Sequence, residues 1–282
     1  MLTTFIRQAV FPCIPEFTRP LWLLASGRAA PFARKIAVDF TVRGYRVKTI
    51  ETQGELRQVL RLRQAVFHRE FAGRRVSFRS DRDVLDDAAD HLAIIDLKLD
   101  RVAGVYRLLP SFVGHPFYSD SEFDLAPLLA LPGGKLELSR ACIDRQYRSG
   151  AVITLLWKGI AEYAKKVEAT YLFGLSSVNS VDLDQLIRIH RYFDQNSMLA
   201  RNVAITPREA YHIAGFDEAY AANLDAAALG ADVPSLFKTY IKAGARVCSQ
   251  PVIDRAFNCA DWLTLLDLSE LEGGFGRKFM RS

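Results

Sequence analysis

The chain has 282 residues, of which 50% are apolar, so it can build a substantial core in one large domain or two small ones. Its four cysteines (Cys13, Cys142, Cys248 and Cys259) lie far apart without paired spacing, which argues against a disulfide framework and against a zinc site. No apolar run approaches the roughly 20 residues that a transmembrane helix needs. We therefore expect an ordinary globular protein in a reducing, cytoplasmic setting.

The formal charge of +5 is concentrated at the front of the chain, because residues 1–50 alone carry +6. Within residues 1–35, basic side chains alternate with many Phe, Leu, Ile and Trp residues, a mixture that suits a lipid headgroup region. The alternative is an arm that packs on the body of the protein with its arginines in solvent. Nucleic acid is disfavoured as a partner, because no recognised binding module accompanies the basic residues. We divide the chain into an arm (1–35), one domain (36–268) and a tail (269–282).

The first half of the domain begins with alternating apolar residues over 36–50, which predict a strand or hairpin with Gly44 at the turn. Helical spacing of apolar residues follows over 51–70, and the polar stretch 74–90 is expected to be a long loop. Three strands are predicted next, at 91–97, 102–109 and 135–143. The segment 110–134, rich in Pro, Gly and aromatic residues, should cover one end of the sheet.

The second half begins with the clearest helix of the chain, at 151–166, followed by an apolar strand at 169–176. The last third is predicted to hold helices at 182–198, 207–213 and 234–243 and strands at 245–249 and 262–266. This succession of strands and helices indicates a mixed α/β layer structure.

Two charges, Glu137 and Arg140, stand inside the apolar strand 135–143. A carboxylate removed from water costs several kcal/mol unless it is paired or hydrogen-bonded. The simple explanation is a structural ion pair, and the functional one is a general base beside an acyl-donor site. At a spacing of three residues the two side chains should point to opposite faces unless a bulge intervenes.

Several ordered motifs resemble one branch of the GCN5-related N-acetyltransferase superfamily, the ornithine N-acyltransferases of ornithine-lipid synthesis, often labelled hemolysin-like. Acyl-homoserine-lactone synthases and N-acyl amino acid synthases are related to this branch. The motifs that carry the resemblance are residues 60–67, Asp86, 90–92, Arg107, 137–140 with the basic glycine turn after it, Trp157, 173–177, 240–245, Asp254, Phe257 and Asp261.

The resemblance implies an α/β fold with a mixed, mostly antiparallel central sheet flanked by helices and a C-terminal extension. It also implies transfer of a (3-hydroxy)acyl chain to the α-amino group of an amino acid, ornithine first among the candidates. The glycine turn keeps only a shifted version of the usual coenzyme A loop, so acyl carrier protein is the expected donor, through its 4'-phosphopantetheine thioester. No tightly bound cofactor and no metal are expected.

The site residues follow from this chemistry, in which the attacking amine must lose a proton. Glu137 is predicted as the base, directly or through water, and Arg140 in a supporting role, pairing Asp86 or Asp90 or positioning substrate. Arg63, Asp86, Asp90 and Arg107 are predicted to bind substrate, with Arg107 in the same ion-pair network. Backbone amides and basic side chains are predicted to hold the donor arm, from Ala141, Cys142, Arg145, Arg148, Ser149, Gly150, Ala151 and Val152.

Two further predictions concern neighbouring residues and the place of the enzyme. His91 is expected to be a hydrogen bonder at a strand start, and Cys142 is not expected to act as a covalent nucleophile. A protein whose product carries a long acyl chain should lie peripherally on the cytoplasmic face of the inner membrane, on anionic lipid.

Other functions remain open at the level of sequence. The chain could acylate a different amino acid as an N-acyl amino acid synthase, or make an acyl-homoserine-lactone signal, although such synthases are generally shorter. A binding-only membrane protein is disfavoured, because Glu137 and Arg140 are intact.

Overall fold

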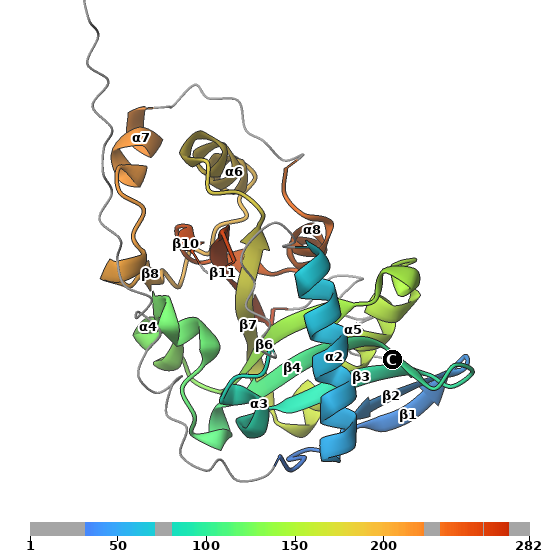
Figure 1. The fold of residues 1–282 in the computed structure, drawn as a ribbon. Helices are drawn as coiled ribbons and strands as arrows, with labels where there is room; N and C mark the ends of the chain where they lie inside the picture. Colours follow the sequence, from blue (N-terminus) through green and yellow to red (C-terminus); the bar gives the residue numbers. More distant parts are fainter. Residues whose placement is uncertain (1–31, 71–80, 223–231, 256, 271–282) are drawn as a thin grey trace, which may run out of the picture.

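A central twisted sheet organises the computed structural model, which describes residues 32–70, 81–222, 232–255 and 257–270 (Figure 1). Its strands follow one another in the order β1 (Asp39–Val42), β2 (Tyr45–Thr49), β3 (Asp90–Asp96), β4 (Arg101–Pro110), β6 (Gly134–Ile143), β7 (Ala169–Val178), β11 (Cys259–Asp267) and β10 (Val252–Asp254), and β9 (Arg246–Val247) also pairs with β11. These strands pair antiparallel except β6 and β7, which run parallel. The predicted fold class is confirmed.

The predicted hairpin is formed by β1 and β2, which turn at Arg43 and Gly44, both with positive φ. Glycine adopts this backbone region without steric cost, which explains its place in the turn.

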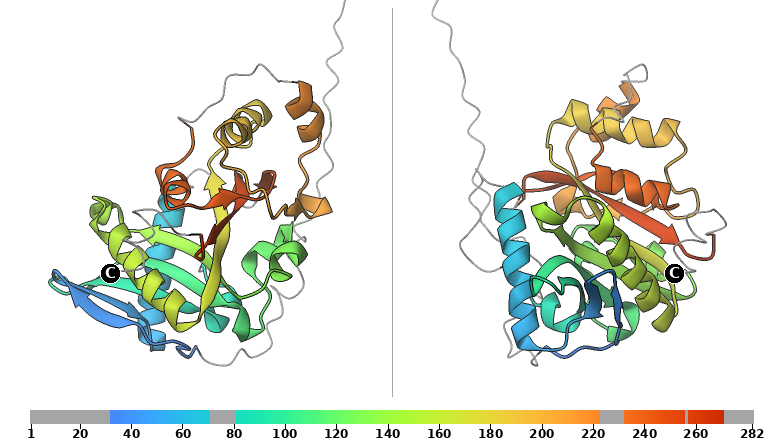
Figure 2. Two further views of the ribbon diagram at one scale, coloured as in Figure 1. Left: turned by 180° about the vertical axis from the view of Figure 1, so that it is seen from behind. Right: turned by 90° about the vertical axis from the view of Figure 1, so that its right-hand side faces the viewer.

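Helices cover both faces of the sheet, as the views in Figure 2 show. Helix α2 (Gln53–Glu70) begins with a capping box, in which Thr52 Oγ1 accepts from the Glu55 amide and the Glu55 carboxylate accepts from the Thr52 amide. Helix α5 (Ala151–Lys166) follows Gly150, whose φ of 99° forms the turn into the helix. Along β3, Leu92 packs in the core under α5 while the next residue, Ala93, packs in the core under α2.

The C-terminal part adds a second core around Trp262 of β11. Apolar residues of α6 (Leu183–Gln195), α7 (Phe216–Ala222) and α8 (Ser235–Lys242) pack there. The helix predicted at 207–213 is wrong. Pro207 instead lies in β8 (Thr206–Pro207), which pairs with β5 (Phe123–Asp124), and only a 3-10 turn, η4 (Glu209–Tyr211), follows.

Short elements fill two stretches that the sequence left without structure. The helix α3 (Leu85–Ala88) occupies part of the predicted loop 74–90. The segment before β6 holds η1 (Ser111–Val113), η2 (Tyr118–Ser121), β5 and α4 (Ala126–Leu129), and η3 (Arg145–Tyr147) follows β6. Each is too short to show apolar periodicity.

The predicted arm and tail fall mostly outside the described residues, which begin at Phe32 and end at Glu270. Phe32 is buried in the core under α2, and the Lys35 amide donates to the Asp90 carboxylate at 2.8 Å, so residues 32–35 belong to the body. Among the described helices, none has the length and apolar character required to cross a bilayer.

Candidate active site

A cavity of about 570 Å³ opens where β6 and β7 separate. The two strands pair only as far as Glu137 opposite Phe173. Beyond this point residues of both strands line the cavity, among them Ser139 and Arg140 on β6 and Ser176 and Ser177 on β7. The parallel strands β6 and β7 therefore separate into a site that can receive a ligand between them.

A bulge in β6 shapes the wall of this cavity. The register between β4 and β6 shifts between Val105 and Arg107, so that Arg140 and Ala141 both face Tyr106, and Arg140 has a φ of 53°. The extra residue of a bulge leaves the regular ladder of backbone hydrogen bonds. The bulge required for Glu137 and Arg140 to lie on one side of the strand is confirmed.

Arg140 lies in the cavity wall between aromatic rings and carboxylates. Its guanidinium stands 4.7 Å from the ring centre of Tyr118 and 6.0 Å from that of Phe257. Its Nη2 donates to Asp83 at 3.1 Å, and Asp81 lies 3.8 Å from Nε. Arg140 therefore forms an ion pair, as predicted, but its partners are Asp83 and Asp81 instead of the predicted Asp86 or Asp90.

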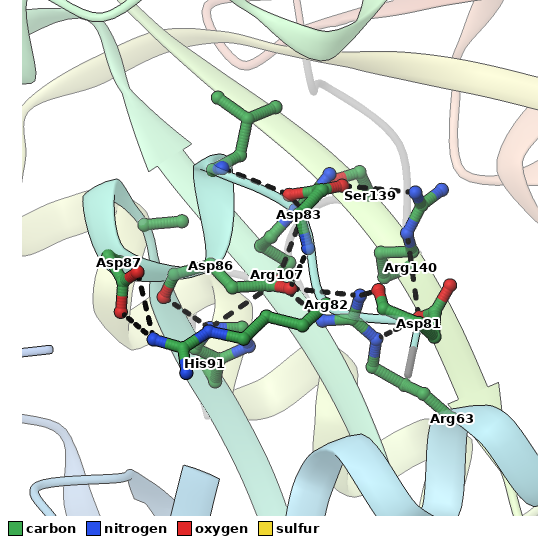
Figure 3. A network of polar contacts seen from close by, with 12 residues as sticks. Arg63, Asp81, Arg82, Asp83, Asp86, Asp87, His91, Arg107, Ser139 and Arg140 are labelled. Atoms are coloured by element: carbon green, nitrogen blue, oxygen red, sulfur yellow. Dashed lines mark hydrogen bonds and ion pairs between the residues drawn. The ribbon is translucent and has the colours of Figure 1, made fainter. Parts of the chain in front are cut away.

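Arg140 forms the edge of a buried network that Figure 3 shows. Arg63 donates to Asp86 at 2.6 Å and to Asp81 at 2.6 Å, while Arg107 donates to Asp83 at 2.6 Å and to Asp86 at 3.1 Å. Three arginines thus neutralise three aspartates, and the arginine charges hold the pKa of Asp86 well below its usual range despite burial.

This network corrects the roles predicted for Arg63, Asp86 and Arg107. All three side chains are buried and lie outside the cavity wall. They connect α2, α3 and β4 to each other, and Arg107 Nε donates to Ser139 Oγ on β6 at 3.0 Å. They support the wall on which Arg140 stands and lie outside the cavity lining.

Asp90 also has a structural position. Its carboxylate accepts from the amides of Lys35 and Ile36 and from the Tyr163 hydroxyl, each within 2.9 Å. Asp90 thus connects the start of the domain to β3 and α5. This structural position replaces the substrate-binding role predicted for it. His91 is the predicted hydrogen bonder: Nε2 donates to the Asp86 carbonyl at 3.0 Å, and burial lowers its pKa to about 4.

The Glu137 carboxylate lies behind the cavity wall rather than in it. It is fully buried and accepts three hydrogen bonds, from the amides of Tyr118 and Ser119 and from the Ser119 hydroxyl, at 2.6 to 2.8 Å. Burial raises its pKa. Because the Glu137 carboxylate does not line the cavity, the prediction that it contacts the acceptor amine directly is wrong. Ser119, in contrast, both lines the cavity and contacts Glu137.

The predicted donor residues divide into two groups at the start of α5. Ala141, Cys142, Arg148 and Gly150 line the cavity. Arg145, Ser149 and Ala151 are exposed outside its lining, and Val152 is buried against Gly104, so these four side chains do not line the cavity. Cys142 is buried and its thiol donates to the Leu62 carbonyl at 3.8 Å.

Sequence reasoning missed the site roles of Tyr118, Ser119 and Ser177. The first two lie in an irregular segment without periodicity, so no local signal marks them. Asp254 and Asp261 were singled out as motif residues without a role, and both line the cavity. Burial raises the pKa of Asp261 to about 7, and Asp254 adds to this effect, while a hydrogen bond from Ser177 opposes it.

Comparisons with known proteins agree with this geometry. Residues 62–158 match the model of an acetyltransferase (GNAT) domain. The chain is 33% identical over 236 residues to an L-ornithine N(alpha)-acyltransferase of Rhodobacter capsulatus, covering 79% of this chain and 90% of that protein. It is 32% identical over 251 residues to a protein of the same name from Agrobacterium fabrum, covering 82% of this chain and 85% of that protein.

Among solved structures, an N-acyl amino acid synthase from uncultured soil microbes aligns with a TM-score of 0.44 at 10% identity, covering 80% of this chain and 92% of that one. The two relatives named above are similar over most of both chains, and the matched domain contains the second half of α2, the bulged strand β6 and the first half of α5. The chain is an N-acyltransferase with a GNAT domain and belongs to the L-ornithine N(alpha)-acyltransferase family.

Proposed function

We propose that this protein transfers an acyl chain from a thioester donor to the α-amino group of ornithine, the first step of ornithine-lipid synthesis. The observation that carries the proposal is the 33% identity to an L-ornithine N(alpha)-acyltransferase over 90% of that protein's length. A cavity between β6 and β7, with a basic start of α5 on one side and carboxylates on another, supports it.

The reaction is aminolysis of a thioester. The amine nitrogen attacks the thioester carbonyl, a C–N bond forms, the C–S bond breaks, and the thiolate takes up a proton. Backbone amides at the bulge beside Ala141 and Cys142 stabilise the oxyanion. The thiolate takes the second proton that the attacking nitrogen loses, and Tyr106 and Tyr240, whose hydroxyls contact each other at the cavity wall, remain protonated because burial raises the pKa of both groups, so they can donate a hydrogen bond to the departing sulfur.

Proton removal from the amine passes through Ser119. The Ser119 hydroxyl donates to Glu137 at 2.6 Å, which leaves its oxygen free to accept a proton from an ammonium group in the cavity. As the ammonium proton moves to Ser119, the Ser119 proton moves to Glu137. The raised pKa of Glu137 makes this carboxylate a better base than an exposed one.

The donor is acyl carrier protein. The N-terminus of α5 meets the cavity at Gly150 and Ile153, and main-chain amides at a helix start suit the single phosphate of a 4'-phosphopantetheine arm. The exposed Arg145 and Arg148 stand beside this entrance, where they can attract an acidic carrier.

The front of the chain holds the enzyme on the cytoplasmic face of the inner membrane. Residues 1–31 combine Arg7, Arg19 and Arg28 with a high density of large apolar residues. A product with a long acyl chain leaves most directly into the lipid on which such an arm would lie.

Incubation of the purified chain with 3-hydroxyacyl carrier protein and ornithine tests the proposal. Mass spectrometry should detect Nα-acyl ornithine, and cells that express the chain should accumulate it relative to an empty-vector control. A folded protein that acylates other amino acids or homoserine-lactone precursors, and leaves ornithine unmodified, would contradict the proposed acceptor.

Two substitutions test the proton path. Glu137→Gln keeps the shape of the side chain but removes the base, and general bases contribute roughly 100-fold to 10,000-fold in rate. Ser119→Ala should lower turnover as well, because it interrupts the path between the cavity and Glu137. Wild-type turnover of Ser119→Ala with saturating amine at neutral pH would show that Glu137 acts without Ser119.

Comparison of two donors tests the carrier. Acyl carrier protein should be a far better donor than the matching acyl-coenzyme A, and its advantage should fall with salt. Arg145→Glu should weaken the reaction with acyl carrier protein and leave the reaction with acyl-coenzyme A unchanged. The exposed Arg61→Glu on α2 serves as the control with the same change of charge. Equal use of both donors at all ionic strengths would contradict carrier docking.

A further inference from the structure

A group of acidic side chains stands in the part of the cavity formed by β7, β10 and β11. Asp254 and Asp261 line the cavity together with Cys259, and the ligand atoms of these three side chains lie within 4.8 Å of one another. Asp261 is 3% exposed and accepts from the Cys259 thiol at 3.9 Å. Nothing in the proton path through Ser119 and Glu137 uses these carboxylates.

Glu122 adds a third carboxylate behind this wall. Its side chain is 2% exposed, and within the described part of the chain its Oε2 has no hydrogen-bond partner. Asp261 and Asp254 are the two charges that act most strongly on Glu122, and together with burial they raise its pKa. A buried carboxyl oxygen without a partner, close to two further acids, favours the protonated form of Glu122, and a cation bound among these acids would favour its charged form.

The described lining of the cavity offers few positive charges to meet these acids. Its basic residues are Arg140 and Arg148. Arg140 is already paired with Asp83 and stacked on Tyr118, while Arg148 Nε donates to the Ile143 carbonyl near the start of α5. Within the described lining, both basic side chains thus have partners of their own, and an ammonium group of a ligand can add a positive charge beside Asp261 and Glu122.

We propose that Asp261, Asp254 and Glu122 form the subsite for the side-chain ammonium group of the acceptor amino acid. The inference rests on the proposed function and names the residues that select a diamino acid over an amino acid with an uncharged side chain. In this arrangement the α-amine faces Ser119, and Arg140 is placed to meet the α-carboxylate. Asp261 reaches the ligand directly, and the nearby ammonium charge favours the ionised form of Glu122, which acts from behind the wall.

An ammonium group fits these donors better than a metal ion. A zinc ion would draw on the Cys259 thiolate, but burial and the neighbouring Asp261, Asp254 and Glu122 raise the pKa of this thiol well above its usual value. A protonated thiol and several carboxylates are suited to a ligand that donates hydrogen bonds and carries a positive charge.

The test compares ornithine with 2-aminopentanoic acid, which has the same carbon chain and lacks the side-chain amine. For the full chain with one acyl donor, kcat/KM should be higher for ornithine by about tenfold to 100-fold, the range expected for a hydrogen bond between charged groups. Asp261→Asn should remove most of this preference by raising KM for ornithine, while kcat/KM for 2-aminopentanoic acid changes by less than about threefold.

One control and two further measurements test the assignment. Asp184→Asn, an exposed acid at the start of α6, makes the same change of charge away from the cavity and should preserve the preference. Glu122→Gln should reduce the preference even though Glu122 does not line the cavity. Binding of ornithine, followed as the rise in melting temperature of the wild-type protein, should exceed that of 2-aminopentanoic acid and should lose this excess in Asp261→Asn.

Equal use of the two amino acids by the wild-type protein would overturn the subsite, as would an equal loss for both in a folded Asp261→Asn variant. Stoichiometric binding of Zn²⁺ that depends on Asp261 and is required for activity would overturn it in favour of a metal site. If the wild-type protein acylates neither amino acid yet acylates another amine, the proposed function itself fails, which distinguishes the two conclusions.

Discussion

At the scale of single residues, burial separates the charges that maintain the fold from those that face the cavity. Arg63, Asp86 and Arg107 are fully or almost fully buried, and Asp86 forms ion pairs with both arginines. Arg140 belongs to the same network but keeps one face in the cavity. The network therefore holds Arg140 in place against the aromatic rings that flank it.

Asp86→Asn should destabilise the protein by about 3 to 5 kcal/mol at neutral pH, because it leaves two buried arginines without their shared partner. The pKa of Asp86 is lowered in the folded state, so its contribution is present above the unfolded value of 3.8 and is lost as the pH falls below it. Urea unfolding measures the effect. The exposed pair of Asp39 and Arg46 provides the control, because Asp39→Asn should cost about 1 kcal/mol or less; equal losses would show that the buried network is not stabilising.

Asp261→Asn should have the opposite effect in the absence of ligand. The pKa of Asp261 is raised to about 7, so the charged form costs stability above this pH, and the cost disappears as the pH falls toward the unfolded value of 3.8. The substitution should raise the free energy of unfolding by on the order of 2 to 4 kcal/mol at pH 8 and by almost nothing near pH 4. A loss of stability at pH 8 would mean that the Asp261 carboxylate is well satisfied without ligand.

At the scale of elements, the separation of β6 from β7 creates the site. Pairing ends at Glu137 and Phe173, and the next residue on β7 is Gly174. An added Cβ on Gly174 would stand 2.2 Å from the Leu138 carbonyl oxygen, so only glycine permits this approach of the two backbones.

Gly174→Ala should therefore destabilise the protein by about 1 to 3 kcal/mol or more, since the clash is with backbone that cannot rotate away. Gly54→Ala on α2 is the matched control: its nearest neighbour would lie at an ordinary 3.6 Å, and alanine favours the helix. Thermal unfolding of both variants measures the difference. Equal melting temperatures would show that β6 can move away from residue 174 without a loss of stability.

At the scale of the whole molecule, the described body begins at Phe32, which is packed under α2. Removal of residues 1–31 should leave the body folded and active on a short, soluble acyl donor. Binding to anionic vesicles should fall, because each basic residue near such a surface contributes on the order of 1 kcal/mol. Vesicle sedimentation of the full and shortened chains checks this; unchanged binding would place the membrane contact elsewhere, and loss of folding would show that the arm is part of the core.

Long elements could be predicted from the sequence because their periodicity extends over many residues. The helix predicted at 151–166 is α5 as observed, and the strand predicted at 135–143 differs from β6 by one residue at its start. Short elements such as η2 and α3 have no such periodicity, and the backbone pairing of Thr206 and Pro207 with β5 depends on a segment more than 80 positions earlier in the chain.

The sequence by itself determined the family, the α/β order of the elements and the presence of charges at Glu137 and Arg140 that need partners. Only the tertiary structure decided which charges meet at the site, because the ion pairs of the buried network and the walls of the cavity join residues far apart in the chain. Glu137 is covered by Ser119, Arg140 is paired with Asp83, and Asp261 faces the cavity beside Asp254. A local pattern reports that a buried charge must be satisfied, but the partner is fixed by how the strands and loops pack together.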